Sequence, residues 1–355
     1  MSDTALPTHA PKVSVVVPCF NLGQYVDEAV DSVLQQRIED VEIIVINDGS
    51  TDSSTNELLK NYVRPKTRVV TTENRGLARA RNLGISMSRG EYICALDADD
   101  KLHPDHFNRT VRVLEENPQW AFASMWLQTF GEEDWLWKQD RCDLVTLLGE
   151  CTVCTAALVR ASAVRAVGGF DEHMPDQGYE DWDLWLNLVA NGHVGTIIPE
   201  VLFLYRRRAG SMSSICCYGE PHQRLMRYLV EKYRDHYTTH MAEVLLKKER
   251  DTAEILRANL ELERHIQTWL VPEAQRRREE LDLLNRRLQR IEEEQAVRLE
   301  RDHLTAERAR LAARVSELEG ATAVITRLMT SKSWKITAPL RAVQDTLDRL
   351  RAKTK

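Results

Sequence analysis

The sequence predicts an α/β domain built on a Rossmann-like, mostly parallel sheet, followed by a long helical or coiled-coil extension. In the first hundred residues, short β-branched runs alternate with stretches whose apolar residues follow helical spacing. That alternation is typical of a parallel sheet covered on both faces. From about residue 240 glycine is almost absent, and leucine and isoleucine recur in steps of three and four. This spacing favours a coiled coil or a long helical hairpin.

Four strands are predicted in the first hundred residues, at 13–18, 41–47, 67–73 and 92–97, with helices between them. The helix after residue 52 begins with Asp and Ser, which are residue types that cap helix N-termini. Polar segments at 18–21, 47–52 and 97–100 end three of these strands. Ligands of parallel sheets bind at the carboxyl ends of the strands, so we expect a site at this edge.

The pattern loosens between about 105 and 235, where strands are predicted at 120–126 and 201–208, a strand and helix within 155–170, and a helix over 180–192. Pro272 interrupts the later helical stretch. The apolar stripe beyond it consists of Leu281, Leu284, Leu288 and Ile291, then Leu304, Leu311, Val315, Leu318 and Ile325. The alternative is a single solvated helix stabilised by charged pairs, but the stripe is too regular for that.

Composition narrows the class of protein. The net charge is −6, from 48 basic and 54 acidic residues, so no nucleic-acid partner is expected. We expect no signal peptide and no membrane span, because residues 1–12 lack the required pattern and no window of 18 residues is apolar. The seven scattered cysteines suit a reducing cytoplasm. Cys151 and Cys154 suggest half a zinc site or a redox pair. Without a second ligand pair, structural thiols in a strand are favoured.

Three carboxylates, Asp97, Asp99 and Asp100, follow the apolar run at 92–96. Carboxylates that close repel one another, so something positive is expected beside them. Asp97 and Asp99 can both reach a divalent cation, Mg²⁺ or Mn²⁺, whose shell substrate phosphates would complete. The alternative is a helix cap, because the acids precede a plausible helix at 104–114.

Five segments in order resemble the inverting glycosyltransferases of family 2, which have the GT-A fold. They are VSVVVPCFNLGQYVDEAVDSVLQQ, VEIIVINDGSTDSS, NRGLARARNLGISMSRGEYICALDADD, VGGFDE and YEDWDLWLNLVANG, and the resemblance covers about residues 12–215. It implies transfer of a sugar from a nucleotide-diphosphate donor to a hydroxyl of a saccharide or lipid-linked saccharide acceptor. It implies a divalent cation, Mn²⁺ or Mg²⁺, as cofactor.

The resemblance also assigns residues on the donor side. Asp48 would bind the base, Pro18 and Asn21 would wall the base and ribose, and Arg81 and Asn82 lie in a segment facing the nucleotide. Asp97 would lie near the ribose and metal, Asp99 would bind the metal, and Arg206 and Arg208 would hold the diphosphate. Many relatives carry histidine where this chain has Arg208, and arginine cannot ligate a metal. Arg79 and Arg81 cannot share a helix face, so at least one is expected to be structural or solvated.

On the acceptor side, the resemblance makes Asp181 the general base and gives Glu180 a positioning role. The alternative is that both are acids favoured at a helix N-terminus by its dipole. Trp182 and Trp185 lie three apart on the predicted helix. Two interpretations are left open: one of the two indoles stacks on an acceptor sugar, or both pack in the core.

We expect three regions: a catalytic domain at 1–235, a helical coiled-coil region at 236–325 and a basic amphipathic tail at 326–355. The coiled coil would make a homo-oligomer or act as a spacer. The tail resembles that of bacterial enzymes that assemble surface polysaccharide. It would contact an anionic membrane at the inner face of the plasma membrane, dock on a partner subunit or cap the helices.

Two other functions fit parts of the sequence. One is a non-catalytic scaffold built around the coiled coil, against which the intact Asp99 and Asp181 argue. The other is a nucleotidyltransferase of similar fold, against which Asp181 and VGGFDE argue. The leading hypothesis is a metal-assisted inverting glycosyltransferase that extends a bacterial surface glycan.

Overall fold

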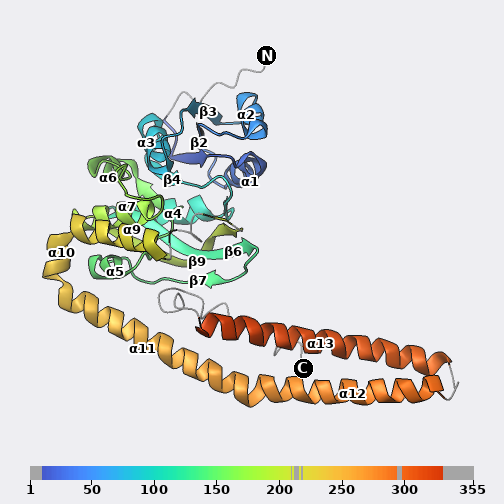
Figure 1. The fold of residues 1–355 in the computed structure, drawn as a ribbon. Coiled ribbons are helices and arrows are strands. Elements are labelled where there is room, and N and C mark those ends of the chain that lie inside the picture. Colours follow the sequence, from blue (N-terminus) through green and yellow to red (C-terminus); the bar gives the residue numbers. More distant parts are fainter. Residues whose placement is uncertain (1–9, 209, 212–215, 217–218, 294–297, 331–355) are drawn as a thin grey trace. The chain divides into compact units, whose positions relative to one another are not determined.

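The computed structural model describes residues 10–208, 210–211, 216, 219–293 and 298–330. The chain forms two compact units, Met1–Lys248 and Glu249–Lys355 (Figure 1). The predicted basic tail lies outside the described residues apart from the last turn of the final helix. Among the described helices, none is both long and apolar enough to cross a membrane.

The first unit begins with four parallel strands. These are β1 (Val13–Cys19), β2 (Val41–Asp48), β3 (Thr67–Thr72) and β4 (Tyr92–Ala95), which pair in the order β3-β2-β1-β4. Helices α1 (Gly23–Leu34) and α2 (Ser53–Lys60) lie on one side of the strands, and α3 (Leu77–Met87) lies on the other (Figure 1). The connections between parallel strands are right-handed, so the direction in which the chain moves across the sheet decides the face on which each helix lies. The chain reverses that direction after β3, and α3 therefore lies on the opposite face from α1 and α2. The four predicted strands and the covered parallel sheet are confirmed here.

The rest of the sheet is mixed rather than parallel. Strand β8 (Leu158–Arg160) runs antiparallel to β4 and to β6 (Trp120–Gly131), and β6 runs parallel to β9 (Val194–Arg207). The sheet has nine strands in the order β3-β2-β1-β4-β8-β6-β9-β5, with β7 beside β6. The expectation of a mostly parallel sheet is confirmed, because the long pairings are parallel and the antiparallel ones involve only the short strands β5, β7 and β8. The remaining elements of this unit are β5 (Lys101–Leu102), α4 (His106–Glu116), β7 (Leu136–Trp137), α5 (Leu144–Gly149), α6 (Ala161–Ala166), α7 (Glu180–Ala190), α9 (Gly219–Lys232) and α10 (Arg234–Thr239).

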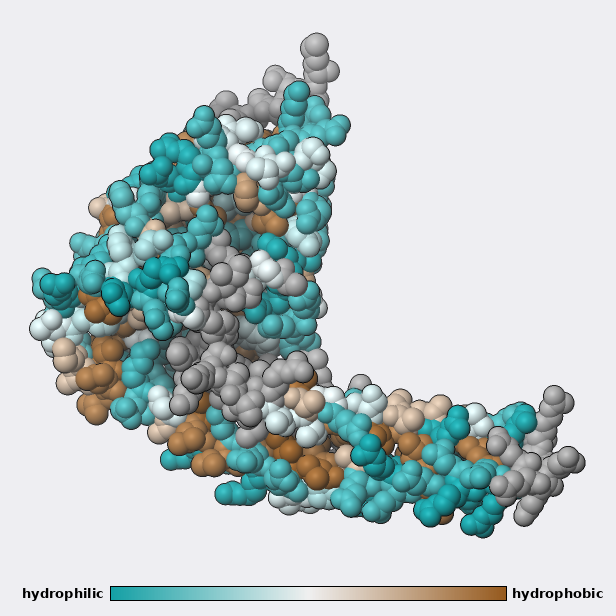
Figure 2. Space-filling view, viewed as in Figure 1, coloured by the Kyte–Doolittle hydropathy of each residue, from teal (hydrophilic) through white to brown (hydrophobic). Residues whose placement is uncertain are grey.

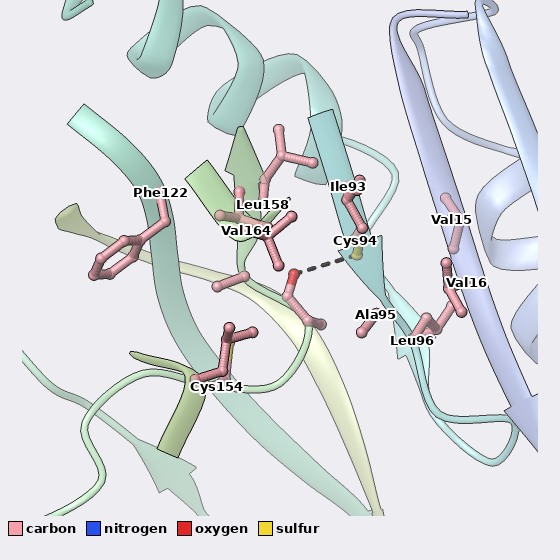
Figure 3. Packing of buried hydrophobic residues seen from close by; sticks show 14 of the residues in the cluster. Val15, Val16, Ile93, Cys94, Ala95, Leu96, Phe122, Cys154, Leu158 and Val164 are labelled. Atoms are coloured by element: carbon pink, nitrogen blue, oxygen red, sulfur yellow. Dashed lines mark hydrogen bonds between the residues drawn. The ribbon is translucent and has the colours of Figure 1, made fainter. Parts of the chain in front are cut away.

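The strands are buried because both sheet faces are covered. Every residue of β1, β2 and β4 is buried, which explains their continuous apolar sequence. Figure 3 shows Ile93, Cys94 and Ala95 of β4 between the valines of β1 and a group that includes Leu158 of β8 and Val164 of α6. The Cys94 thiol donates to the Ala156 carbonyl at 3.4 Å. This packing fixes the strand that leads into Asp97.

Helix α11 (Met241–His265) continues through a π-helical turn, η1 (Ile266–Leu270), into α12 (Val271–Glu293). The predicted interruption at Pro272 is wrong, because the wider turn accommodates a residue that lacks an N–H. Helix α12 and helix α13 (Arg298–Thr330) pack side by side through Leu284, Leu288 and Leu304. This is the long helical hairpin. Apolar side chains also lie on the surface of the helices in Figure 2, and the exposed ones include Leu256, Leu260, Trp269 and Leu283.

Gly84 tests the packing of α3 on β1. A Cβ atom added there would lie 2.2 Å from Cγ1 of Val16, whereas one added at Gly149 would lie 3.8 Å from Cε of Lys248. We expect Gly84→Ala to lower the free energy of unfolding by about 1–3 kcal/mol through overpacking. Gly149→Ala, at the last residue of α5, is the matched control and should change it by less than about 1 kcal/mol. Urea denaturation measures both, and equal effects would contradict the packing.

Candidate active site

The acids after β4 are each bound by an arginine. The Asp97 carboxylate (Oδ1) accepts from Nη2 of Arg81 at 2.7 Å, and Asp99 (Oδ2) accepts from Nε of Arg208 at 2.8 Å. Asp100 (Oδ1) accepts from the backbone N–H of Arg206 at 2.7 Å. The positive partner expected beside these carboxylates is therefore present within the chain itself.

Burial sets the charge of two of these acids. Burial raises the pKa of Asp99, although Arg208 opposes the rise. It raises the pKa of Asp100 well above its usual range, and the charges of Asp99 and Asp97 add to the effect. Asp100 is 1% exposed, and its Oδ2 has no hydrogen-bond partner within the described structure. Burial therefore disfavours the charged form of Asp100, which joins the turn to β9 through the Arg206 N–H.

Arg81 connects the donor-side acids to the helix that carries the predicted base. Its side chain lies in the core at 1% exposure and donates from Nη1 to Oε1 of Glu180 at 3.0 Å, besides its contact with Asp97. Burial opposes the charge, but Asp97, Glu180 and Asp181 raise the pKa of Arg81. Burial raises the pKa of Glu180, and the Arg81 charge opposes this. Arg81 is thus an internal bridge, which agrees with the expectation that at least one of Arg79 and Arg81 is structural or solvated.

Asp181 lies in the first turn of α7, next to Glu180. Its Oδ1 accepts from the backbone N–H of Trp182 at 2.8 Å, and its Oδ2 accepts from the Thr155 hydroxyl at 2.7 Å. These bonds fix the plane of a half-buried carboxylate. The residue before the helix, Tyr179, has φ of 66°, which is unusual for a residue other than glycine. Such backbone strain is concentrated at functional sites.

Thr155 was not found from the sequence. Residues 151–159 were expected to form a strand, but β8 begins only at Leu158 and the preceding segment is irregular. A threonine in a predicted strand gives no signal that its hydroxyl meets an acid 26 positions later. The same segment holds Cys151 and Cys154, and burial raises the pKa of both thiols. Both are free cysteines, in agreement with the structural reading.

Asp48, Pro18 and Asn21 meet at the same edge of the sheet. Asp48 accepts backbone N–H groups from Arg75 at 2.9 Å and from Gly76 at 3.0 Å, so it ties β2 to the start of α3. The Asn21 side chain accepts from the N–H groups of Thr51 and Asp52, which joins the ends of β1 and β2. Pro18 is buried and lies opposite Ile46. The predicted convergence of strand ends is confirmed.

Arg206 is held in place by several contacts. Its Nε donates to the backbone carbonyl of Asp99 at 2.7 Å, and its guanidinium lies over the rings of Tyr25 and Phe130 at 4.6 and 4.4 Å. Glu28 pairs with it at 2.9 Å. These contacts support a structural role for Arg206 in this state, whereas Arg208 is one-third exposed and touches the acid cluster with its side chain.

The two tryptophans of α7, which were candidates for stacking on an acceptor sugar, are buried. Trp182 is 6% and Trp185 1% exposed, and the indole of Trp182 donates to the Leu147 carbonyl at 2.7 Å. Burial therefore supports core packing for both.

Asn82 holds the VGGFDE loop, because its amide bonds the backbone of Phe170 and the Glu172 side chain. It lies against Gly169, where an added Cβ would be 2.4 Å from Oδ1 of Asn82.

Helix α9 fixes α7 from another side. Lys232 lies between two carboxylates, 2.6 Å from Oδ2 of Asp171 and 2.8 Å from Oδ1 of Asp183. The Tyr233 hydroxyl donates to Asp183 at 2.9 Å. Asp183 therefore anchors the helix, whereas Asp181 faces Thr155.

The predicted divalent cation has oxygen donors of the right type in Asp97 and Asp99. Their arrangement nevertheless does not fit a resident cation, because Arg81 and Arg208 already bind these carboxylates. Across the described residues, no group of three or more His, Cys, Asp or Glu side chains is placed to hold a metal. Position 208 offers a guanidinium, which has no lone pair to donate.

Comparisons with known proteins agree with this fold. Residues 14–164 match the family described as Glycosyl transferase family 2. The chain is 39% identical over 109 residues to an uncharacterized glycosyltransferase, EpsJ, of Bacillus subtilis, covering 30% of this chain and 31% of that protein. It is 41% identical over 96 residues to chondroitin synthase of Pasteurella multocida, covering 27% of this chain and 10% of that protein.

One solved structure shows the same fold. It is that of S. aureus TarS residues 1–349 in complex with UDP-GlcNAc, with a TM-score of 0.50 and 19% identity. The match covers 60% of this chain and 63% of that chain. The chain thus spans less than two thirds of each of these three proteins.

Arg81 offers the sharpest test of the site's architecture. We expect Arg81→Met to lower the free energy of unfolding by about 3–5 kcal/mol at pH 7, because Asp97 and Glu180 lose their buried partner. Arg79→Met is the matched control on the same helix. Its ion pair with Glu172 is more than one-third exposed, so we expect a loss under about 1 kcal/mol. Chemical denaturation measures both, and an Arg81→Met variant as stable as Arg79→Met would contradict the bridge.

Proposed function

Because the chain carries a domain of glycosyl transferase family 2, we propose that it is an inverting glycosyltransferase. The reaction moves a sugar from a nucleotide-diphosphate donor to a hydroxyl of a saccharide or lipid-linked saccharide acceptor. The name of the chondroitin synthase relative supports polysaccharide synthesis as the setting, and we propose a bacterial surface glycan as the product class.

The observation that carries this proposal is the bridge from Asp97 through Arg81 to Glu180. It joins the edge of the sheet where Asp48 and the strand ends meet to the helix turn that holds Asp181. A transferase needs its donor site and its base within reach of one another, and these elements are separated by some eighty residues in sequence. The fully buried Arg81 leaves little freedom in their relative placement.

The chemistry proposed for Asp181 is a single proton transfer. Its carboxylate takes the proton of the acceptor hydroxyl while that oxygen attacks the anomeric carbon. The bond between that carbon and the diphosphate oxygen breaks, and its electron pair leaves with the nucleoside diphosphate. One base and one displacement invert the anomeric configuration. Thr155 holds the carboxylate in one orientation by donating its hydroxyl proton to Oδ2.

The test is a panel of nucleotide sugars and saccharide acceptors, with released nucleoside diphosphate as the readout. We expect Asp181→Asn to keep donor binding and to lose about 10²–10⁴-fold in turnover, the range of a lost general base. Asp176→Asn is the matched control, because this acid pairs with Arg224 on α9 rather than with Thr155.

Three outcomes would contradict the proposal. Turnover of Asp181→Asn within threefold of the parent would exclude the assigned base. Release of inorganic diphosphate would indicate a nucleotidyltransferase. Binding of none of the donors by the folded protein would favour the scaffold.

A further inference from the structure

We propose that Arg208 takes the place of a divalent cation at Asp99, so that the donor diphosphate binds without a metal. This rests on the proposed function, because it concerns how the same site binds its donor. The starting observation is the ion pair between Nε of Arg208 and Oδ2 of Asp99, which spans 109 positions in sequence.

The backbone fixes this pair, so it is not a chance contact of long surface side chains. Asp97, Asp99 and Asp100 form the acid turn, and β5 follows it directly. Strand β9 pairs with β5, with Leu204 opposite Lys101. The N–H of Arg206 bonds Asp100, and the Arg206 side chain bonds the carbonyl of Asp99. Arg208 follows two residues later, immediately beyond the end of β9. The end of that strand is thus tied to this turn by three contacts besides the Arg208–Asp99 pair itself.

Arginine side chains already contact the acids after β4. Arg81 meets Asp97, Arg208 meets Asp99, and the Arg206 guanidinium lies beside the turn through its bond to the Asp99 carbonyl. A cation bound between Asp97 and Asp99 would lie against two carboxylates that guanidinium groups already contact. It would also have to displace Arg208 from Asp99.

Arginine has the chemistry that a diphosphate requires. Its guanidinium stays charged at any physiological pH and carries five N–H groups in a planar fork that matches phosphate oxygens. The contact with Asp99 uses one of these N–H groups. The Arg208 side chain is 31% exposed, and Asp99 is 14% exposed, so a ligand can reach this end of the cluster. Arg208 would neutralise the charge that grows on the leaving diphosphate.

Calorimetric titration of the full-length protein with UDP, GDP and dTDP tests this directly. Each titration is run once with EDTA and once with Mn²⁺. We expect the nucleotide that binds to show dissociation constants within threefold of one another under the two conditions. We expect Arg208→Ala to weaken binding tenfold or more in both. We expect Arg208→His, which offers a metal ligand, to bind weakly in EDTA and to recover with Mn²⁺.

Arg207→Ala is the matched control. Arg207 is the neighbouring arginine and pairs with Glu133 at 3.0 Å, so its loss should leave nucleotide binding unchanged. Parent protein that binds a nucleotide only with Mn²⁺ would overturn the inference while leaving the proposed function intact. Equal binding by the parent and Arg208→Ala would overturn it as well. Failure of all three nucleotides under both conditions would instead count against the proposed function.

Discussion

The buried guanidinium of Arg81 is the interaction on which the rest of the site depends. It lies on α3, contacts Asp97 after β4 and Glu180 at the start of α7, and has the ring of Phe170 at 5.1 Å. A charge removed from water is costly unless its partners are charged and well placed. Here two carboxylates from distant segments supply that compensation. The same contacts that make Arg81 tolerable therefore fix Asp97 relative to the helix of Asp181.

The site is built from oppositely charged groups delivered by separate elements. Strand β4 delivers three acids to the carboxyl edge of the sheet, and α3 and the end of β9 deliver the arginines that bind them. Helix α7 is fixed at Glu180 by Arg81 and at Asp183 by Lys232. Because these charges are oriented by contacts within the chain, the proposed transfer would need little reorganisation when charge develops on its leaving group. Asp181 lies between these two anchors, with Thr155 against its carboxylate.

Local patterns were sufficient for much of the fold. The buried strands at β1, β2 and β4 are continuous apolar runs, and Asp52 caps α2 as its position indicates. What depends on distant packing was not available from the sequence. The Thr155–Asp181 bond, the arginine partners of the three acids, and the burial of Trp185 all join segments that only the folded chain brings together. The break predicted at Pro272 is wrong for a related reason, because a π-helical turn precedes the proline and the helix continues through it.

The stereochemistry of the product tests the central claim most directly. With the donor that proves active, the anomeric configuration of the transferred sugar is read from the proton coupling constants of the product. A single displacement assisted by Asp181 predicts the configuration opposite to that of the donor. A product that retains the donor's configuration would contradict it, because retention requires a second displacement or a different attack that one base in this position does not provide.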